Sequence, residues 1–144
     1  MSGLDSISVK VESLGGSADN VHNAVPVLNE IRHALGKLAD TGETTTIDLS
    51  SIPFGAGDKQ QLLSVLGRGE VEATVDAMGP TRIRETAFAG VWLVEYFDAE
   101  EREIGAHIQV TRMPALLATP EDDVAESAAA LSARLARDDP FHEH

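Results

Sequence analysis

The side chains that most often do chemistry in proteins are scarce in this sequence. None of the 144 residues is a cysteine, which excludes disulfides, thiolate nucleophiles and zinc or iron–sulfur sites held by Cys. Serines are plentiful, but no G-x-S-x-G motif and no evident Ser–His–acid set accompanies them. Asp48 and Glu43 flank a strand-like segment, and nothing in the sequence pairs either with a base or a nucleophile. We therefore predict that the chain is not an enzyme and has no catalytic residues.

Histidine offers the remaining candidates for metal binding. His107 lies on the polar side of an alternating segment beside Gln109, a setting typical of a hydrogen-bonded surface histidine. The C-terminal His142-Glu143-His144 could chelate a metal, but a loose acidic tail lacks the preformed geometry that selects one. We predict neither a metal site nor a cofactor. Metal handling by His107 and this tail is the alternative function.

Two glycines one residue apart, in Leu66-Gly67-Arg68-Gly69-Glu70-Val71, raise the question of a phosphate-binding loop. Such loops run from a strand through glycines into a helix, so that backbone N–H groups and the positive helix end face the anion. Here the order is reversed, because helical spacing precedes Gly67 and alternation follows Gly69, with acidic residues close behind. We predict a structural joint, with Gly67 in the left-handed conformation after the last helical turn, or at most a recognition surface.

The charge of the chain restricts its partners. The sequence has 24 acidic and 11 basic residues, a formal net charge of −13. Such a surface repels phosphate backbones and anionic lipid, so we predict no nucleic-acid and no membrane partner. No apolar run approaches the ~18 residues of a membrane span, and the N-terminus lacks the basic start and apolar region of a secretory signal. We predict a cytoplasmic protein.

Alternation of apolar and polar residues predicts the strands. They cover residues 6–12, 44–49, 70–77, 81–86, 91–97 and 104–111. The segment VWLVEYF, residues 91–97, is apolar on both faces, which is typical of a strand in the middle of a sheet. Turns at residues 78–80 and 98–101 join the later strands into a meander.

Apolar residues spaced three and four positions apart predict the helices. The first begins around Asn23, with Pro26 in its first turn, and ends at Gly42. A second, short helix begins at Asp58, which resembles the start of a capping box with Gln61, and ends at Gly67. The last begins after Thr119, a capping hydroxyl followed by proline and carboxylates.

Together these elements predict a single α+β domain over residues 1–144. Its antiparallel β-sheet is a meander of about four strands plus one or two N-terminal strands, packed by two longer helices and one short helix. The core of this domain covers about residues 22–124. We expect the acidic tail, residues 139–144, to be frayed.

The order of these segments resembles a known family. Four pieces carry the resemblance: Ile47-Asp48-Leu49 with Pro53, Leu66 to Val71, Glu85-Thr86 leading to Gly90-Val91-Trp92, and His107-Ile108 before Pro114. With this spacing, residues 22–124 are similar to the C-terminal conserved region of the HupH/HyaF family of hydrogenase expression/formation proteins. The combined spacing is fairly specific, whereas each piece alone would be weak.

The resemblance implies an accessory role in making uptake NiFe hydrogenase. Proteins of this family are thought to act as dedicated chaperones on the small, iron–sulfur-bearing subunit before its assembly and export, without enzymatic activity. The implied partner is the precursor of that subunit, and other hydrogenase maturation proteins are further candidates. The lack of cysteine agrees, because such a chain can help an iron–sulfur subunit only by contact. The alternative is a nickel-binding or metal-handling accessory protein of the same pathway, with His107 and the His142-Glu143-His144 tail as the nickel ligands.

For binding this partner we predict a surface around Arg68, Gly69, Glu70, Thr86 and Trp92. Typical members of the family carry a further region ahead of the conserved one. We therefore expect that two copies of this chain associate, through an exposed sheet edge or the Trp92 strand.

Overall fold

The computed structural model describes residues 22–76, 78–137, 139 and 141. The chain forms two units, Met1–Arg112 and Met113–His144, and the sheet belongs to the first. The strand predicted over residues 6–12 lies outside the described residues, as do His142 and His144. The prediction of a single domain over residues 1–144 stays a prediction.

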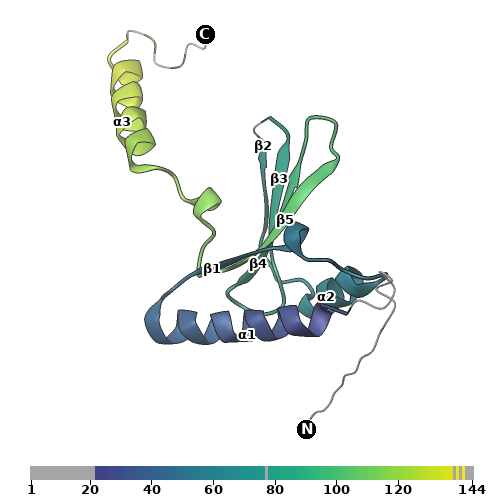
Figure 1. Ribbon diagram of the computed structural model, residues 1–144. Coiled ribbons are helices and arrows are strands. Elements are labelled where there is room, and N and C mark those ends of the chain that lie inside the picture. The colour runs from purple at the N-terminus through teal and green to yellow at the C-terminus, as the bar shows by residue number, and fades with distance from the viewer. Residues whose placement is uncertain (1–21, 77, 138, 140, 142–144) are drawn as a thin grey trace. The chain divides into compact units, whose positions relative to one another are not determined.

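A five-stranded antiparallel sheet organises the first unit (Figure 1). The spatial order of its strands is β1-β5-β4-β3-β2. The strands are β1 (Thr45–Asp48), β2 (Glu72–Asp76), β3 (Pro80–Glu85), β4 (Val91–Phe97) and β5 (Glu103–Val110). Strands β2 to β5 form the predicted four-strand meander, β1 adds to its end beside β5, and the apolar strand β4 is central. The predicted α+β fold is confirmed.

Helix α1 (Ala24–Thr41) begins and ends where the sequence predicts. Asn23 precedes its first turn, which contains Pro26, where the missing N–H of proline has no intrahelical partner to lose. Gly42 ends the helix in the left-handed conformation, with φ of 78°. Its N–H donates to the carbonyl of Leu38 at 3.0 Å, which satisfies one of the last carbonyls of the helix.

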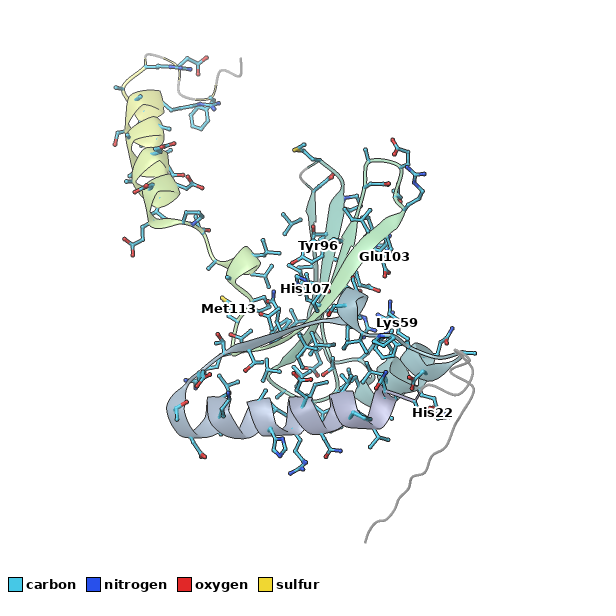
Figure 2. The ribbon with its side chains drawn as sticks, viewed as in Figure 1. His22, Lys59, Tyr96, Glu103, His107 and Met113 are labelled. Carbon is cyan, nitrogen blue, oxygen red and sulfur yellow. The ribbon has the colours of Figure 1, made fainter. Side chains whose placement is uncertain are left out.

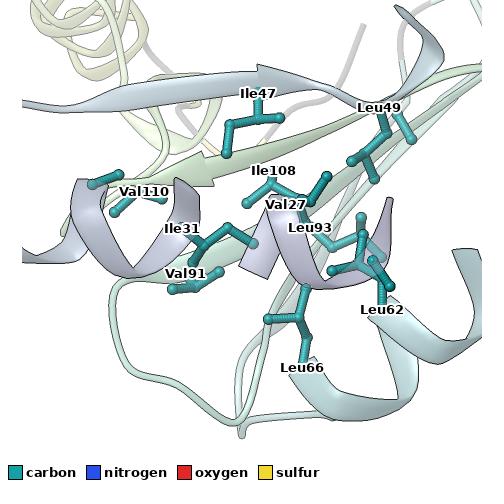
Figure 3. Packing of buried hydrophobic residues seen from close by; sticks show 13 residues of the cluster. Val27, Ile31, Ile47, Leu49, Leu62, Leu66, Val91, Leu93, Ile108 and Val110 are labelled. Atoms are coloured by element: carbon teal, nitrogen blue, oxygen red, sulfur yellow. The ribbon is translucent and has the colours of Figure 1, made fainter. Parts of the chain in front are cut away.

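The core lies between one face of the sheet and two helices, α1 and α2 (Asp58–Leu66) (Figure 3). Alternate residues point into it from the first half of β4 (Val91, Leu93) and the second half of β5 (Ala106, Ile108, Val110), because side chains alternate between the two faces of a strand. The short helix η2 (Leu49–Ser51), which the sequence analysis did not predict, adds Leu49. The buried cluster is Ala24, Val27, Ile31, Ala34, Ile47, Leu49, Leu62, Leu66, Val91, Leu93, Ala106, Ile108 and Val110.

The predicted capping box at the start of α2 is wrong. Asp58 is the first residue of α2, and Gly57 occupies the N-cap position with φ of 75°. The carboxylate of Asp58 instead accepts the backbone N–H groups of Asn23 and Ala24, at 2.6 and 2.9 Å. The side chain therefore caps α1, which has no capping bond from Asn23 itself.

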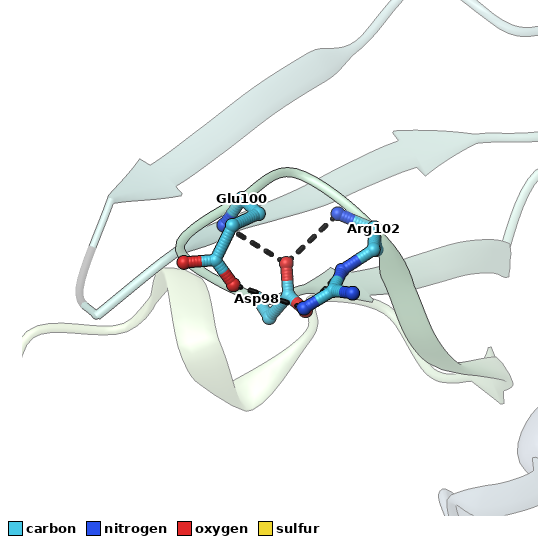
Figure 4. A network of polar contacts seen from close by, with 3 residues as sticks. All are labelled: Asp98, Glu100 and Arg102. Carbon is cyan, nitrogen blue, oxygen red and sulfur yellow. Dashed lines mark hydrogen bonds and ion pairs between the residues drawn. The ribbon is translucent and has the colours of Figure 1, made fainter.

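The turn between β4 and β5 is held by a charged network (Figure 4). Asp98 Oδ1 accepts the backbone N–H groups of Glu100 and Arg102, both at 2.9 Å. The Arg102 guanidinium reaches back to Asp98 Oδ2 at 3.1 Å and to Glu100 Oε1 at 3.0 Å. Exposed ion pairs contribute little stability, so the main effect of Asp98 is to fix the predicted turn through its two backbone bonds.

The second unit contains η3 (Ala115–Leu117) and α3 (Glu121–Leu135). The predicted cap by Thr119 is wrong, because Pro120 occupies the N-cap position and no side chain caps the helix. The predicted carboxylates do lie in the first turn, as Glu121, Asp122 and Asp123, where they favour the positive end of the helix dipole. Among the described residues, no helix is long and apolar enough to cross a membrane.

Replacing Asp58 tests whether its carboxylate fixes α1 and α2 to each other. Asp58→Ala leaves the N–H groups of Asn23 and Ala24 without their acceptor. We expect the free energy of unfolding to fall by about 2–3 kcal/mol, measured by urea denaturation at pH 7. The matched control is Lys59→Ala, the next residue, which removes only the partly exposed ion pair to Glu103 and costs less than about 1 kcal/mol. Equal effects of the two changes would contradict the capping role.

Candidate functional site

The glycine segment that the sequence analysis singled out joins α2 to β2. Helix α2 ends at Leu66 and β2 begins at Glu72, so the order is helix, glycines, strand, as predicted. Gly67 has φ of 65° and ψ of −156°. The positive φ was predicted, but this ψ lies outside the left-handed helical region, in a region that is essentially restricted to glycine.

Gly69 is required by a close approach of two backbones. Its N–H donates to the carbonyl of Glu85 at 2.8 Å. A Cβ atom at this position would lie 2.5 Å from the carbonyl oxygen of Thr86, closer than two such atoms can approach. The neighbouring carbonyl of Gly67 accepts a hydrogen bond from the Arg84 guanidinium at 2.9 Å. The segment is therefore bound to the end of β3 on both sides of Arg68.

The loop from β3 to β4 is built around a buried threonine. Thr86 is 2% exposed, and its hydroxyl lies 3.2 Å from both the N–H and the carbonyl of Phe88. The backbone N–H of Thr86 donates to the carbonyl of Val91, and the N–H of Ala87 donates to the carbonyl of Leu66. These bonds hold Phe88 at the surface with its side chain exposed. Thr86 thus shapes the loop, whereas Phe88, which the sequence analysis did not select, is available for contact.

Of the five predicted binding residues, Arg68 and Glu70 have the exposed, charged side chains. Arg68 pairs with Glu72 at 3.1 Å, and both side chains are mostly exposed. Gly69 is exposed but has no side chain to offer. Trp92 is 7% exposed and donates its indole N–H to the carbonyl of Thr111 at 3.0 Å. The structure thus brings Gly69 and Thr86 together, and it buries Trp92 in the central strand.

Two apolar hollows lie along α1, beside the loop that carries Phe88. The first has a volume of about 300 Å³ and is lined by Leu28, Ile31, Arg32, Leu35, Val65, Leu66 and Phe88. The second, of about 420 Å³, is lined by Leu35, Leu38, Ala39, Gly42, Ala89, Gly90 and Arg112. Leu35 lines both, and Phe88, Ala89 and Gly90 follow one another in the chain. We call the two hollows together the α1 trough.

A polar cluster on β1, β4 and β5 was missed by the sequence analysis. The Tyr96 hydroxyl lies 3.3 Å from Nδ1 of His107, with the two rings edge to face (Figure 2). Nε2 of His107 lies 3.9 Å from Asp48 Oδ1. The pairings Asp48–His107 and Val94–His107 in the sheet bring these residues together, and strand order of this kind leaves no local signal in a sequence.

The metal alternative finds no geometric support in the described part of the chain. No group of three or more His, Cys, Asp or Glu side chains there could hold a metal ion. Among the described residues, Asp48 is the carboxylate that lies within 4 Å of His107. The histidines of the tail, His142 and His144, lie outside the described residues.

These features define a small α+β protein whose described surface combines apolar hollows with exposed charged side chains. The α1 trough lies beside a hydrogen-bonded loop, and a charged segment, Arg68 to Glu70, follows α2. The chain belongs to the HupH family: the model of the HupH hydrogenase expression protein, C-terminal conserved region, matches residues 21–137.

Individual relatives agree with this family. The hydrogenase expression protein HupH from Thiobacillus denitrificans has a similar structure, with a TM-score of 0.77 and 42% identity, covering 81% of this chain and 97% of that one. The hydrogenase expression/formation protein HupQ of Azotobacter chroococcum is 36% identical over 76% of this chain and 39% of its own length. HoxQ of Azotobacter vinelandii is 34% identical over 80% of this chain and 41% of its own. The chain thus spans well under half of these two relatives.

A pair of glycine substitutions tests whether the joint at Gly69 is structural. Gly69→Ala places a methyl group against the Thr86 carbonyl, and we expect the free energy of unfolding to fall by about 1–3 kcal/mol. Gly36→Ala is the matched control, because Gly36 lies inside α1 with nothing within 4 Å of the added atom. It should raise stability by about 0.5–1 kcal/mol. Thermal or urea unfolding measures both, and a neutral Gly69→Ala would refute the close approach.

Proposed function

We propose that this chain is a non-catalytic accessory factor in the formation of NiFe hydrogenase, and that it binds the immature iron–sulfur small subunit before assembly and export. The observation that carries the proposal is the family match over residues 21–137, with relatives named hydrogenase expression/formation proteins. The chain spans 39–41% of those two relatives, so their complete activity is not transferred by the match alone.

The chemistry of the chain supports action by contact. Without cysteine it has no thiolate with which to hold or transfer an iron–sulfur cluster. The glycine joint, Gly67 to Gly69, and the α1 trough carry exposed side chains around them. These side chains are suited to binding an unfinished polypeptide. A net charge of −13 steers a partner that carries a positively charged export signal. Such a partner is made in the cytoplasm, where we place this chain as well.

Within this proposal, Arg68 and Glu70 take part in binding the subunit, while Gly69, Thr86 and Trp92 position the surface. In co-purification, we expect the double variant Arg68→Ala/Glu70→Ala to capture at least about fivefold less subunit precursor than wild type. This corresponds to a loss of about 1 kcal/mol of binding free energy. The Tm of the variant should be nearly unchanged, because the exposed pair Arg68–Glu72 contributes little stability.

The control for this experiment is Lys37→Ala, which removes an ion pair to Glu43 that is also more than half exposed. It should leave both capture and Tm unchanged. Undiminished capture by the double variant would remove these residues from the binding surface. If wild-type chain retained no hydrogenase polypeptide at all, the proposed function itself would be refuted.

We further expect self-association through a sheet edge. Strand β4 is paired on both sides and Trp92 is buried, so in the described sheet the open edges belong to β1 and β2. Light scattering across micromolar concentrations should give twice the mass of one chain. A mass of one chain throughout that range would contradict the expected dimer.

A further inference from the structure

The α1 trough has an arginine in each of its two hollows, Arg32 in the first and Arg112 in the second. The guanidinium of Arg32 donates to the side-chain oxygen of Asn29 at 3.1 Å. Among the described residues, no carboxylate pairs with either arginine. In a chain with 24 acidic and only 11 basic residues, two cations without a carboxylate partner on one surface are unexpected.

The other basic residues of the described first unit are engaged elsewhere. Four of them form ion pairs: Lys37 with Glu43, Lys59 with Glu103, Arg68 with Glu72, and Arg102 with Asp98 and Glu100. Arg84 donates to the carbonyl of Gly67, and Arg82 lies over the ring of Phe97 at 4.7 Å. Four arginines of the described first unit thus form no ion pair with a described carboxylate, and two of them, Arg32 and Arg112, line the trough.

The walls of the trough restrict the backbone of anything that binds there. One wall is α1, whose interior N–H and C=O groups bond within the helix. In the opposite wall, the N–H groups of Ala87, Phe88 and Val91 donate to Leu66, Thr86 and Phe88 within the fold. A bound strand would thus bury backbone groups without partners, which is costly. A helix satisfies its own backbone and avoids this cost.

The length of the trough also suits a helix. Leucines 28, 35 and 38 lie along eleven residues of α1. The ten steps from the first to the last cover about 15 Å at the rise of an α-helix. An apolar stripe of about three helical turns would lie along this row, with Phe88 and the exposed Val65 on its far side.

We propose that the α1 trough binds an amphipathic helix of the client polypeptide, with an apolar face toward Leu28, Leu35 and Phe88 and carboxylates that pair with Arg32 and Arg112. Burial of the apolar stripe supplies most of the affinity, and the two guanidinium–carboxylate pairs select an acidic helix over a basic one. The identification of this client, the bound polypeptide, as a hydrogenase subunit rests on the proposed function. The prediction that the bound helix is acidic and amphipathic rests on the trough alone.

The first experiment measures the chemistry of the trough with two synthetic helical peptides of about 16 residues. They share one leucine stripe and differ in carrying Glu or Lys beside it. Fluorescence anisotropy should show the Glu peptide binding the full-length chain at least about tenfold more tightly than the Lys peptide. The double variant Arg32→Glu/Arg112→Glu should reverse this preference. Equal binding, or tighter binding of the Lys peptide by wild-type chain, would overturn the proposal.

The second measurement locates the binding site. Phe88 and Val65 are both exposed and line the trough. Phe88→Asp and Val65→Asp should each lower the affinity for the Glu peptide at least about tenfold. Val71→Asp is the control, because Val71 is similarly exposed but does not line the trough. Equal loss in the control would place the site elsewhere. A concentration-dependent dimer that Phe88→Asp abolishes would show that a second copy occupies the trough, and would likewise overturn the proposal.

Co-purification with the hydrogenase small-subunit precursor separates this inference from the proposed function. If wild-type chain retains the precursor and Phe88→Asp does not, both stand. If Phe88→Asp retains as much precursor as wild type, the trough is not the docking site for this client, while the proposed function stands. If the Glu peptide binds as expected but no precursor is retained, the trough binds acidic helices and the proposed function is refuted.

Discussion

The buried carboxylate of Asp58 is the interaction on which the arrangement of the helices depends. It is 3% exposed and accepts two N–H groups from the start of α1, 34 and 35 residues earlier in the chain. Because Asp58 also begins α2, its negative charge lies at the positive ends of both helices. Removing the carboxylate would break the polar connection between the starts of the two helices. The first hollow of the trough lies between α1 and the end of α2, so its shape depends on the same contact.

The opposite side of the trough is fixed by the glycine joint. Gly69 lets the chain pass against the carbonyl of Thr86, and the bond from Ala87 to Leu66 ties the β3–β4 loop to the end of α2. Phe88 is therefore an exposed aromatic side chain on a well-bonded loop. A binding surface held in this way loses little conformational entropy when a partner binds. The residues that the sequence analysis selected for contact thus include several whose main effect is to position a neighbour.

Local patterns predicted the elements well, because each rests on interactions between residues close in the sequence. The alternation of β2 to β5, the leucine and valine spacing of α1, and the stop at Gly42 all belong to this kind. The cap of α1 could not be found in this way, since its acceptor, Asp58, is distant in the chain and looked like the cap of its own helix. The cluster of Asp48, Tyr96 and His107 and the α1 trough likewise depend on strand order and helix placement. Neither leaves a local periodicity.

The distribution of charge indicates how one small protein can hold different parts of a client. Its net charge of −13 attracts a basic segment over distances of the order of the Debye length, about 8 Å at physiological salt. At contact, the apolar surface around Arg32 and Arg112 excludes water and strengthens their pairing with carboxylates. A basic segment held near the acidic surface and an acidic helix in the trough would not compete, because each would be repelled from the site of the other. Opposite charges at two sites would thus fix the direction in which a client polypeptide lies on the protein.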